Sequence, residues 1–131
     1  MVSRLLLVCL GGALGSGLRF VISGALARAL GPGFPYGTLA VNLAGSFVIG
    51  LVQEIGTTSL LISDSARLFL ATGVMGGLTT YSAFSYETVR LVEASAWYQA
   101  WVNVIATTAL CLLCCVLGIA AGRLAVGFRG G

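Results

Sequence analysis

The sequence predicts an all-α membrane protein whose single domain, residues 1–131, contains four transmembrane helices. The first observation is the composition, since 58% of the residues are hydrophobic and 8% are charged, against about 25% charged residues in soluble domains. The second is a series of uncharged runs over residues 29–53, 68–86 and 94–122. The third is an apolar stretch over residues 5–27 that only Arg19 interrupts.

Each of these runs is long enough to span a bilayer. About 20 helical residues, each rising about 1.5 Å, cross about 30 Å of hydrocarbon. We therefore expect helices over residues 5–30, 37–55, 67–92 and 97–126, with Thr38 as the N-cap of the second. The first stretch has an alternative interpretation as a cleaved secretory signal, because Ala25-Leu26-Ala27 is a small-x-small pattern, but Arg19 interrupts the apolar core that such a signal needs.

The third span should be broken near residues 76–80. Gly73, Gly76 and Gly77 fall in its middle, and a polar segment that begins at Thr79 follows them. Backbone carbonyls that a break releases at membrane depth must be buried in protein, line water or coordinate a cation.

The arginines are almost balanced between the two membrane faces. Four spans put Arg4, Arg67, Arg123 and Arg129 on one side, and Arg19, Arg28 and Arg90 toward the other. The positive-inside rule therefore selects no orientation. Either the chain inserts both ways round and pairs as an antiparallel dimer, or the balance is a coincidence in a singly oriented protein.

Small residues at four-residue spacing indicate close helix packing, and a bundle of four short helices is thin enough to favour oligomerisation. These pairs do not by themselves locate an interface. They are Gly11/Gly15, Gly12/Ser16, Ser46/Gly50, Gly73/Gly77 and Gly118/Gly122.

The few polar residues at membrane depth are the candidates for function. Thr38, Asn42 and Ser46 share a face of the second helix, and Asn103 and Thr107 share a face of the fourth. Two polar stripes and a broken helix favour a wetted track, although such side chains also bond between helices as structural contacts worth about 0.6 kcal/mol each.

Tyr81 and Phe84 are three residues apart just beyond the expected break. The edges of aromatic rings carry partial positive charge and can approach an anion, whereas core packing is their more common role.

Three motifs resemble the Fluc (CrcB) fluoride channels, and the resemblance covers essentially the whole chain. They are Gly11-Gly12-Ala13-Leu14-Gly15 with Leu18-Arg19-Phe20, Gly37-Thr38-Leu39-Ala40-Val41-Asn42-Leu43-Ala44-Gly45, and Gly76-Gly77-Leu78-Thr79-Thr80-Tyr81-Ser82-Ala83-Phe84-Ser85 with Glu87-Thr88.

The resemblance implies an antiparallel, dual-topology homodimer in the inner membrane that exports fluoride passively and relieves fluoride toxicity. It further implies two fluoride pathways and one central structural sodium ion per dimer. The lipid bilayer is the expected environment, and no nucleic-acid partner is expected. Matching positions give the pathway as Asn42, Thr80, Tyr81, Ser82, Phe84, Asn103 and Thr107, the vestibule as Arg19, Thr38 and Glu87, and the sodium ligands as the backbone carbonyls of Gly76 and Thr79.

The chain departs from the family pattern at two pathway positions. Tyr81 stands where the family usually has phenylalanine, which keeps the ring edge but adds a hydroxyl. Asn103 stands where some relatives carry tyrosine, which changes the hydrogen bonding of the track.

Other functional classes fit the residues less well. The chain has no histidine and no lysine, which argues against most enzymes. A small multidrug exporter needs a carboxylate near the middle of a span, whereas Glu54 and Glu87 lie near span ends. A non-conducting assembly protein leaves the polar stripes unexplained. Cys111, Cys114 and Cys115 crowd one apolar helix without the further ligands that zinc requires.

Overall fold

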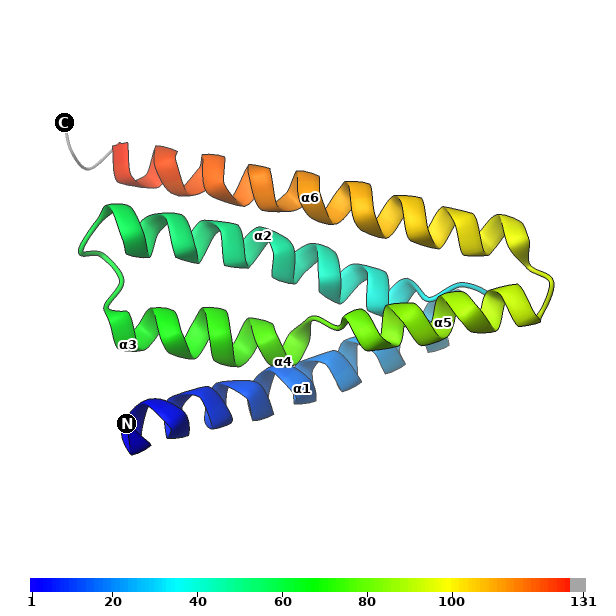
Figure 1. Ribbon diagram of the computed structural model, residues 1–131, viewed down its shortest axis with the longest axis horizontal. Coiled ribbons are helices and arrows are strands. Elements are labelled where there is room, and N and C mark those ends of the chain that lie inside the picture. The colour runs from blue at the N-terminus through cyan, green and yellow to red at the C-terminus, as the bar shows by residue number, and fades with distance from the viewer. Residues whose placement is uncertain (128–131) are drawn as a thin grey trace.

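The computed structural model describes residues 1–127, which fold into helices joined by short connections (Figure 1). The described residues contain no β-strand, so the expected all-α class is confirmed. The elements in chain order are α1 (Val2–Leu30), α2 (Tyr36–Thr58), α3 (Asp64–Arg67), the π-helical η1 (Leu68–Met75), α4 (Gly76–Leu78), α5 (Tyr81–Glu93) and α6 (Trp97–Gly127).

Three of these helices, α1, α2 and α6, are long and apolar enough to cross a membrane within the described chain. The remaining expected span is divided in two. Its first half is the continuous run of α3, η1 and α4, its second half is α5, and Thr79 and Thr80 separate them. The break therefore falls at the end of the interval near residues 76–80 that the sequence predicted.

Three helix starts differ from the sequence predictions, and the first helix begins at Val2 instead of residue 5. The second helix begins at Tyr36, so Thr38 lies inside its first turn and is not the N-cap. The third segment begins at Asp64 instead of residue 67, because the Ser63 side chain accepts a hydrogen bond of 3.2 Å from the Ala66 amide. Ser63 is thus the N-cap, and the carboxylate of Asp64 in the first turn interacts favourably with the positive end of the helix dipole.

Both described chain ends lie at the end of the bundle that carries the α2–α3 connection, and the α1–α2 and α5–α6 connections lie at the other end (Figure 1). Arg28 and Arg90 occupy the last turns of α1 and α5. Arg4 and Arg67 line one pocket at the opposite end. Arg129 lies outside the described residues.

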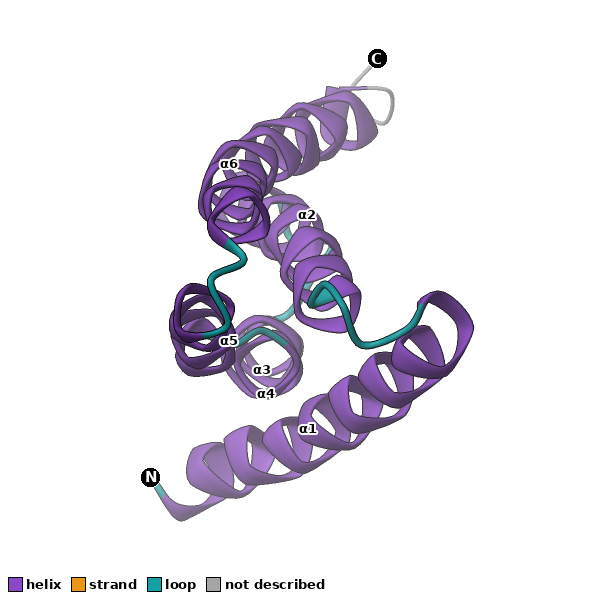
Figure 2. Ribbon diagram, turned by 90° about the vertical axis from the view of Figure 1, so that its right-hand side faces the viewer, coloured by secondary structure: helices purple, strands orange, loops and turns teal. Residues whose placement is uncertain are grey.

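Glycines allow close approach of backbones in two helix pairs. A Cβ at Gly118 of α6 would collide with the Phe47 carbonyl of α2, and a Cβ at Gly15 of α1 would collide with the Val74 carbonyl of η1. Figure 2 shows α6 beside α2 and α1 inclined against the broken segment. The predicted small residues therefore lie between helices of the same chain, where the backbones are in direct contact.

Candidate ion pathway

Asn42 holds the break in the third segment. Its Oδ1 accepts a hydrogen bond of 2.8 Å from the Thr80 amide, and its Nδ2 donates one of 3.1 Å to the Thr80 carbonyl. Both Asn42 and Thr80 are buried. A buried polar backbone group without a partner costs free energy, so the Asn42 side chain takes over the role that a helical turn would otherwise play.

The break diverts the amides that would bond two carbonyls in a continuous α-helix. The Thr80 amide, four residues after Gly76, donates to Asn42 instead. The Ala83 amide, four residues after Thr79, donates over 3.1 Å to Thr80 Oγ1, which is the N-cap of α5. The Gly76 and Thr79 carbonyls therefore lack these helical partners and are available as oxygen ligands for a hard cation.

No cluster of histidine, cysteine, aspartate or glutamate that could hold a metal occurs in residues 1–127. The Thr79 hydroxyl donates a hydrogen bond of 2.8 Å to the Met75 carbonyl, so it already has a partner within its own helix.

Two aromatic rings stand at the start of α5. The ring centroids of Tyr81 and Phe84 are 5.4 Å apart, and the ring planes are inclined by 52°. Phe84 is buried, whereas Tyr81 is 80% exposed on the isolated chain. One ring therefore packs within the chain, and the other faces outward from it.

A cavity of about 350 Å³ brings most of the predicted pathway residues together between α2, the break and α6. Ser82 does not line it, but its Oγ lies 3.2 Å from Thr80 Oγ1. Asn103 is also outside its lining and is buried to 1% exposure. The predicted residues that line the cavity are Asn42, Gly76, Thr79, Thr80, Tyr81, Phe84 and Thr107.

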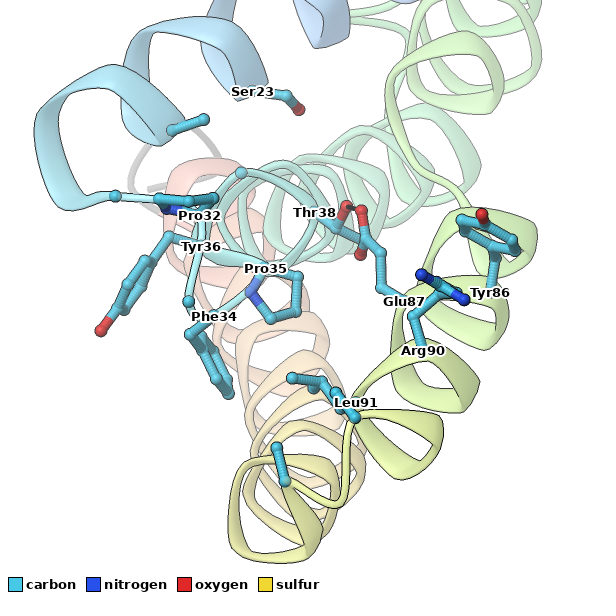
Figure 3. Close-up of a pocket in the computed structure, with 16 residues that line it drawn as sticks. Ser23, Pro32, Phe34, Pro35, Tyr36, Thr38, Tyr86, Glu87, Arg90 and Leu91 are labelled. Atoms are coloured by element: carbon cyan, nitrogen blue, oxygen red, sulfur yellow. Dashed lines mark hydrogen bonds between the residues drawn. The ribbon is translucent and has the colours of Figure 1, made fainter.

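A larger cavity of about 600 Å³ opens near the α1–α2 connection (Figure 3). Thr38 Oγ1 donates a hydrogen bond of 2.8 Å to Glu87 Oε1 at its wall, so the structure brings two predicted vestibule residues together. The other carboxylate oxygen of Glu87 is buried and has no hydrogen-bond partner among the described residues. The lining includes Arg90, and Arg19 is not part of it.

Sequence reasoning assigned no site role to Arg90 and Cys111, which line these cavities, or to Thr88, which lies outside both linings. Arg90 follows Glu87 by three residues on the same helix, a spacing that puts them on one face, and its guanidinium contacts Glu93 over 2.7 Å. Cys111 lines the smaller cavity. Thr88 lies beside Glu87 and bonds Asn103 of α6 over 2.9 Å, a contact that no local sequence signal predicts.

The chain is similar to known proteins over nearly its whole length. The family described as "CrcB-like protein, Camphor Resistance (CrcB)" matches residues 6–119. A "Fluoride-specific ion channel FluC" of Trichlorobacter lovleyi is 50% identical, with 86% of this chain and 88% of the relative aligned. Proteins with the same name from Anaeromyxobacter sp. (strain K) and Geobacter sp. (strain M21) are 51% and 45% identical, over 86% and 93% of this chain and 89% and 98% of their own lengths. This chain is therefore a multi-pass membrane protein that belongs to the CrcB-like family.

Proposed function

We propose that this chain is a fluoride channel that exports fluoride passively and thereby relieves fluoride toxicity. The single observation that carries the proposal is the cavity beside the broken helix, where amide, hydroxyl and aromatic groups converge in a protein whose relatives bear the name fluoride-specific ion channel. The family is one of ion channels, so the chain is not an enzyme.

The chemistry of the cavity suits a small anion that must lose its water. A selective pathway has to replace the hydration shell of the ion with donors and partial positive charge. Thr80 carries a hydroxyl group, and the Phe84 and Tyr81 rings carry electropositive edges. The Asn42 side chain donates one of its two N–H groups to the Thr80 carbonyl, so the second can donate to an anion.

The functional unit in this proposal is an antiparallel homodimer with two pathways in the inner-membrane bilayer. The near-balance of arginines supports insertion in both orientations. The outward-facing Tyr81 supports a pathway that a second copy completes, because a phenol at membrane depth needs a polar or aqueous neighbour. The large vestibule beside Thr38 and Glu87 then supplies the aqueous entrance.

A structural sodium ion is proposed between the two broken helices of the dimer. The Gly76 and Thr79 carbonyls, which have lost their helical donors, are suitable ligands, and two copies contribute four such oxygens. A bound cation supplies positive charge beside the anion pathways in a medium of low dielectric constant. The residues of this chain orient the carbonyls, and Asn42 fixes the turn from which they project.

Ion efflux from proteoliposomes tests this function. We expect purified protein to release fluoride from loaded vesicles, measured with a fluoride electrode, when a potassium ionophore balances the charge. Chloride-loaded vesicles, measured with a chloride electrode under the same conditions, should retain their contents. Equal release of both anions, or of neither, would contradict the proposal.

A further inference from the structure

A chain of side-chain hydrogen bonds connects α6 to α5 next to the pathway. Thr107 Oγ1 donates to Asn103 Oδ1 over 3.3 Å, Asn103 Nδ2 donates to Thr88 Oγ1 over 2.9 Å, and Thr88 Oγ1 donates to the Phe84 carbonyl over 2.7 Å. Asn103 and Thr107 are buried, and so is Phe84. The chain thus links a residue that lines the cavity, Thr107, to the backbone of another, Phe84.

The directions of these bonds follow from the chemistry of the hydroxyl groups. Thr88 has one hydroxyl hydrogen, and the Phe84 carbonyl takes it. Its oxygen can then only accept from Asn103, which therefore presents its NH₂ group to Thr88 and its carbonyl oxygen to Thr107. Each group has one fixed role, so losing any member leaves a buried polar atom without its partner.

The location of this contact matters because α5 is a half-helix. The extended residues Thr79 and Thr80 separate it from α4, so no continuous helix fixes its rotation or its height. Side-chain bonds to neighbouring helices must do so. One turn after Phe84, Glu87 bonds Thr38 of α2, and Thr88 bonds Asn103 of α6.

We propose that Thr88 and Asn103 form a clasp between α5 and α6 that positions Phe84 in the anion pathway. Both are positioning residues: Asn103 is 1% exposed and lies outside the cavity lining, so it acts on the ion through Phe84. This inference rests on the proposed function of the cavity, and it assigns Asn103 a role different from the direct pathway contact that the family resemblance implies.

Near-isosteric substitutions distinguish the effect of the Thr88–Asn103 hydrogen bond from the effect of side-chain packing between the helices. Thr88→Val and Asn103→Leu each remove the interhelical bond, whereas Thr88→Ser keeps the hydroxyl. Ser85→Ala is the matched control, because the Ser85 hydroxyl also bonds back to its own helix, at the Tyr81 carbonyl over 2.9 Å, but has no hydrogen bond to another helix among the described residues.

The first readout is the fluoride efflux rate of dimers that elute normally in gel filtration. We expect Thr88→Val and Asn103→Leu each to lower it by roughly fivefold to tenfold, the effect of one broken buried hydrogen bond. The double variant should be no slower than the slower single variant, because the two side chains act as one unit. Thr88→Ser and Ser85→Ala should keep most of the wild-type rate.

The second readout does not depend on transport. A fluorine label on the ring of Phe84 gives a ¹⁹F resonance that we expect to shift in Thr88→Val and Asn103→Leu and to stay in place in Thr88→Ser and Ser85→Ala. If the wild-type protein moves no fluoride but the resonance behaves in this way, the proposed function fails and the clasp stands. An unshifted resonance in both Thr88→Val and Asn103→Leu, wild-type transport by Thr88→Val, or additive losses in the double variant would overturn the clasp. If Asn103→Leu does not assemble, the comparison of Thr88→Val with Thr88→Ser decides.

Discussion

Asn42 and Thr80 exchange two hydrogen bonds, with the Asn42 side-chain amide bonded to both the N–H and the C=O of the same residue at 2.8 and 3.1 Å. The pair imitates the backbone pairing that a helix turn would have provided. One side chain thus bonds both backbone groups of Thr80 at the break. The neighbouring carbonyls and the start of α5 therefore line a cavity instead of lying inside a continuous helix.

Asn42→Asp should abolish fluoride transport and destabilise the fold. The carboxylate cannot donate to the Thr80 carbonyl, and leaving that group unpaired costs about 1–3 kcal/mol. The negative charge also repels an anion in a medium of low dielectric constant. Efflux measurements and thermal melts in detergent check both effects, and wild-type values for the two would refute this role of Asn42.

Phe84→Ile and Tyr81→Phe should have very different effects. Isoleucine keeps an apolar side chain but deletes the electropositive ring edge, so we expect fluoride efflux to fall severely in protein that still folds. Tyr81→Phe removes only a hydroxyl and should retain most of the rate. A Phe84→Ile channel as fast as the wild type would show that the ring serves only packing.

The contact between α2 and α6 predicts opposite effects for two glycine substitutions. Gly118→Ala forces a methyl group against the Phe47 carbonyl and should lower the melting temperature of the purified protein. Gly17→Ala places the same group where the protomer has open space, and alanine is the better helix former, so its melting temperature should stay the same or rise. Equal shifts in both variants would contradict the backbone contact.

The proposed cation site predicts that Gly76 tolerates substitution in the protomer but not in the sodium-bound dimer. A Cβ there meets nothing within 4 Å on the isolated chain. We expect Gly76→Val to fold but to lose the rise in melting temperature that sodium, compared with a large organic cation, gives the wild type. Thr79→Val should keep that rise, since the Thr79 hydroxyl bonds Met75 and only its carbonyl is a proposed ligand. A sodium-dependent rise in Gly76→Val would count against this site.

Dual topology predicts that a C-terminal reporter is found on both sides of the membrane in one preparation. Two lysines appended after Gly131 should bias the population toward one orientation and reduce fluoride export. Supplying a copy with the opposite bias should restore export. A single orientation of the unmodified chain would rule out the antiparallel dimer.

The sequence predicts the spans well because the thickness of the bilayer fixes their length, and uncharged runs reveal that length directly. The break is also predictable from the glycines and threonines at residues 76–80. Helix rotation is harder to predict. An amide side chain in a transmembrane helix can either bond a neighbouring helix or face water. The spacing of Asn103 and Thr107 is the same in both cases.

The structure distinguishes these cases by contacts that join distant parts of the chain. Asn42 reaches Thr80 across 38 residues, and Thr38 reaches Glu87 across 49. Arg90 lines the larger cavity and Arg19 does not. Whether a side chain of α1 or α5 reaches that cavity depends on how the two helices are inclined. No local pattern in the sequence records that inclination.

The reversal potential of the current through purified channels in a planar bilayer tests the central claim most directly. With a tenfold fluoride gradient and equal chloride on both sides, a passive fluoride-selective pathway should reverse close to the fluoride equilibrium potential, about 59 mV from zero. The value should not move when a chloride or proton gradient is added. A reversal potential that follows chloride, or one that shifts with the proton gradient, would contradict passive fluoride selectivity.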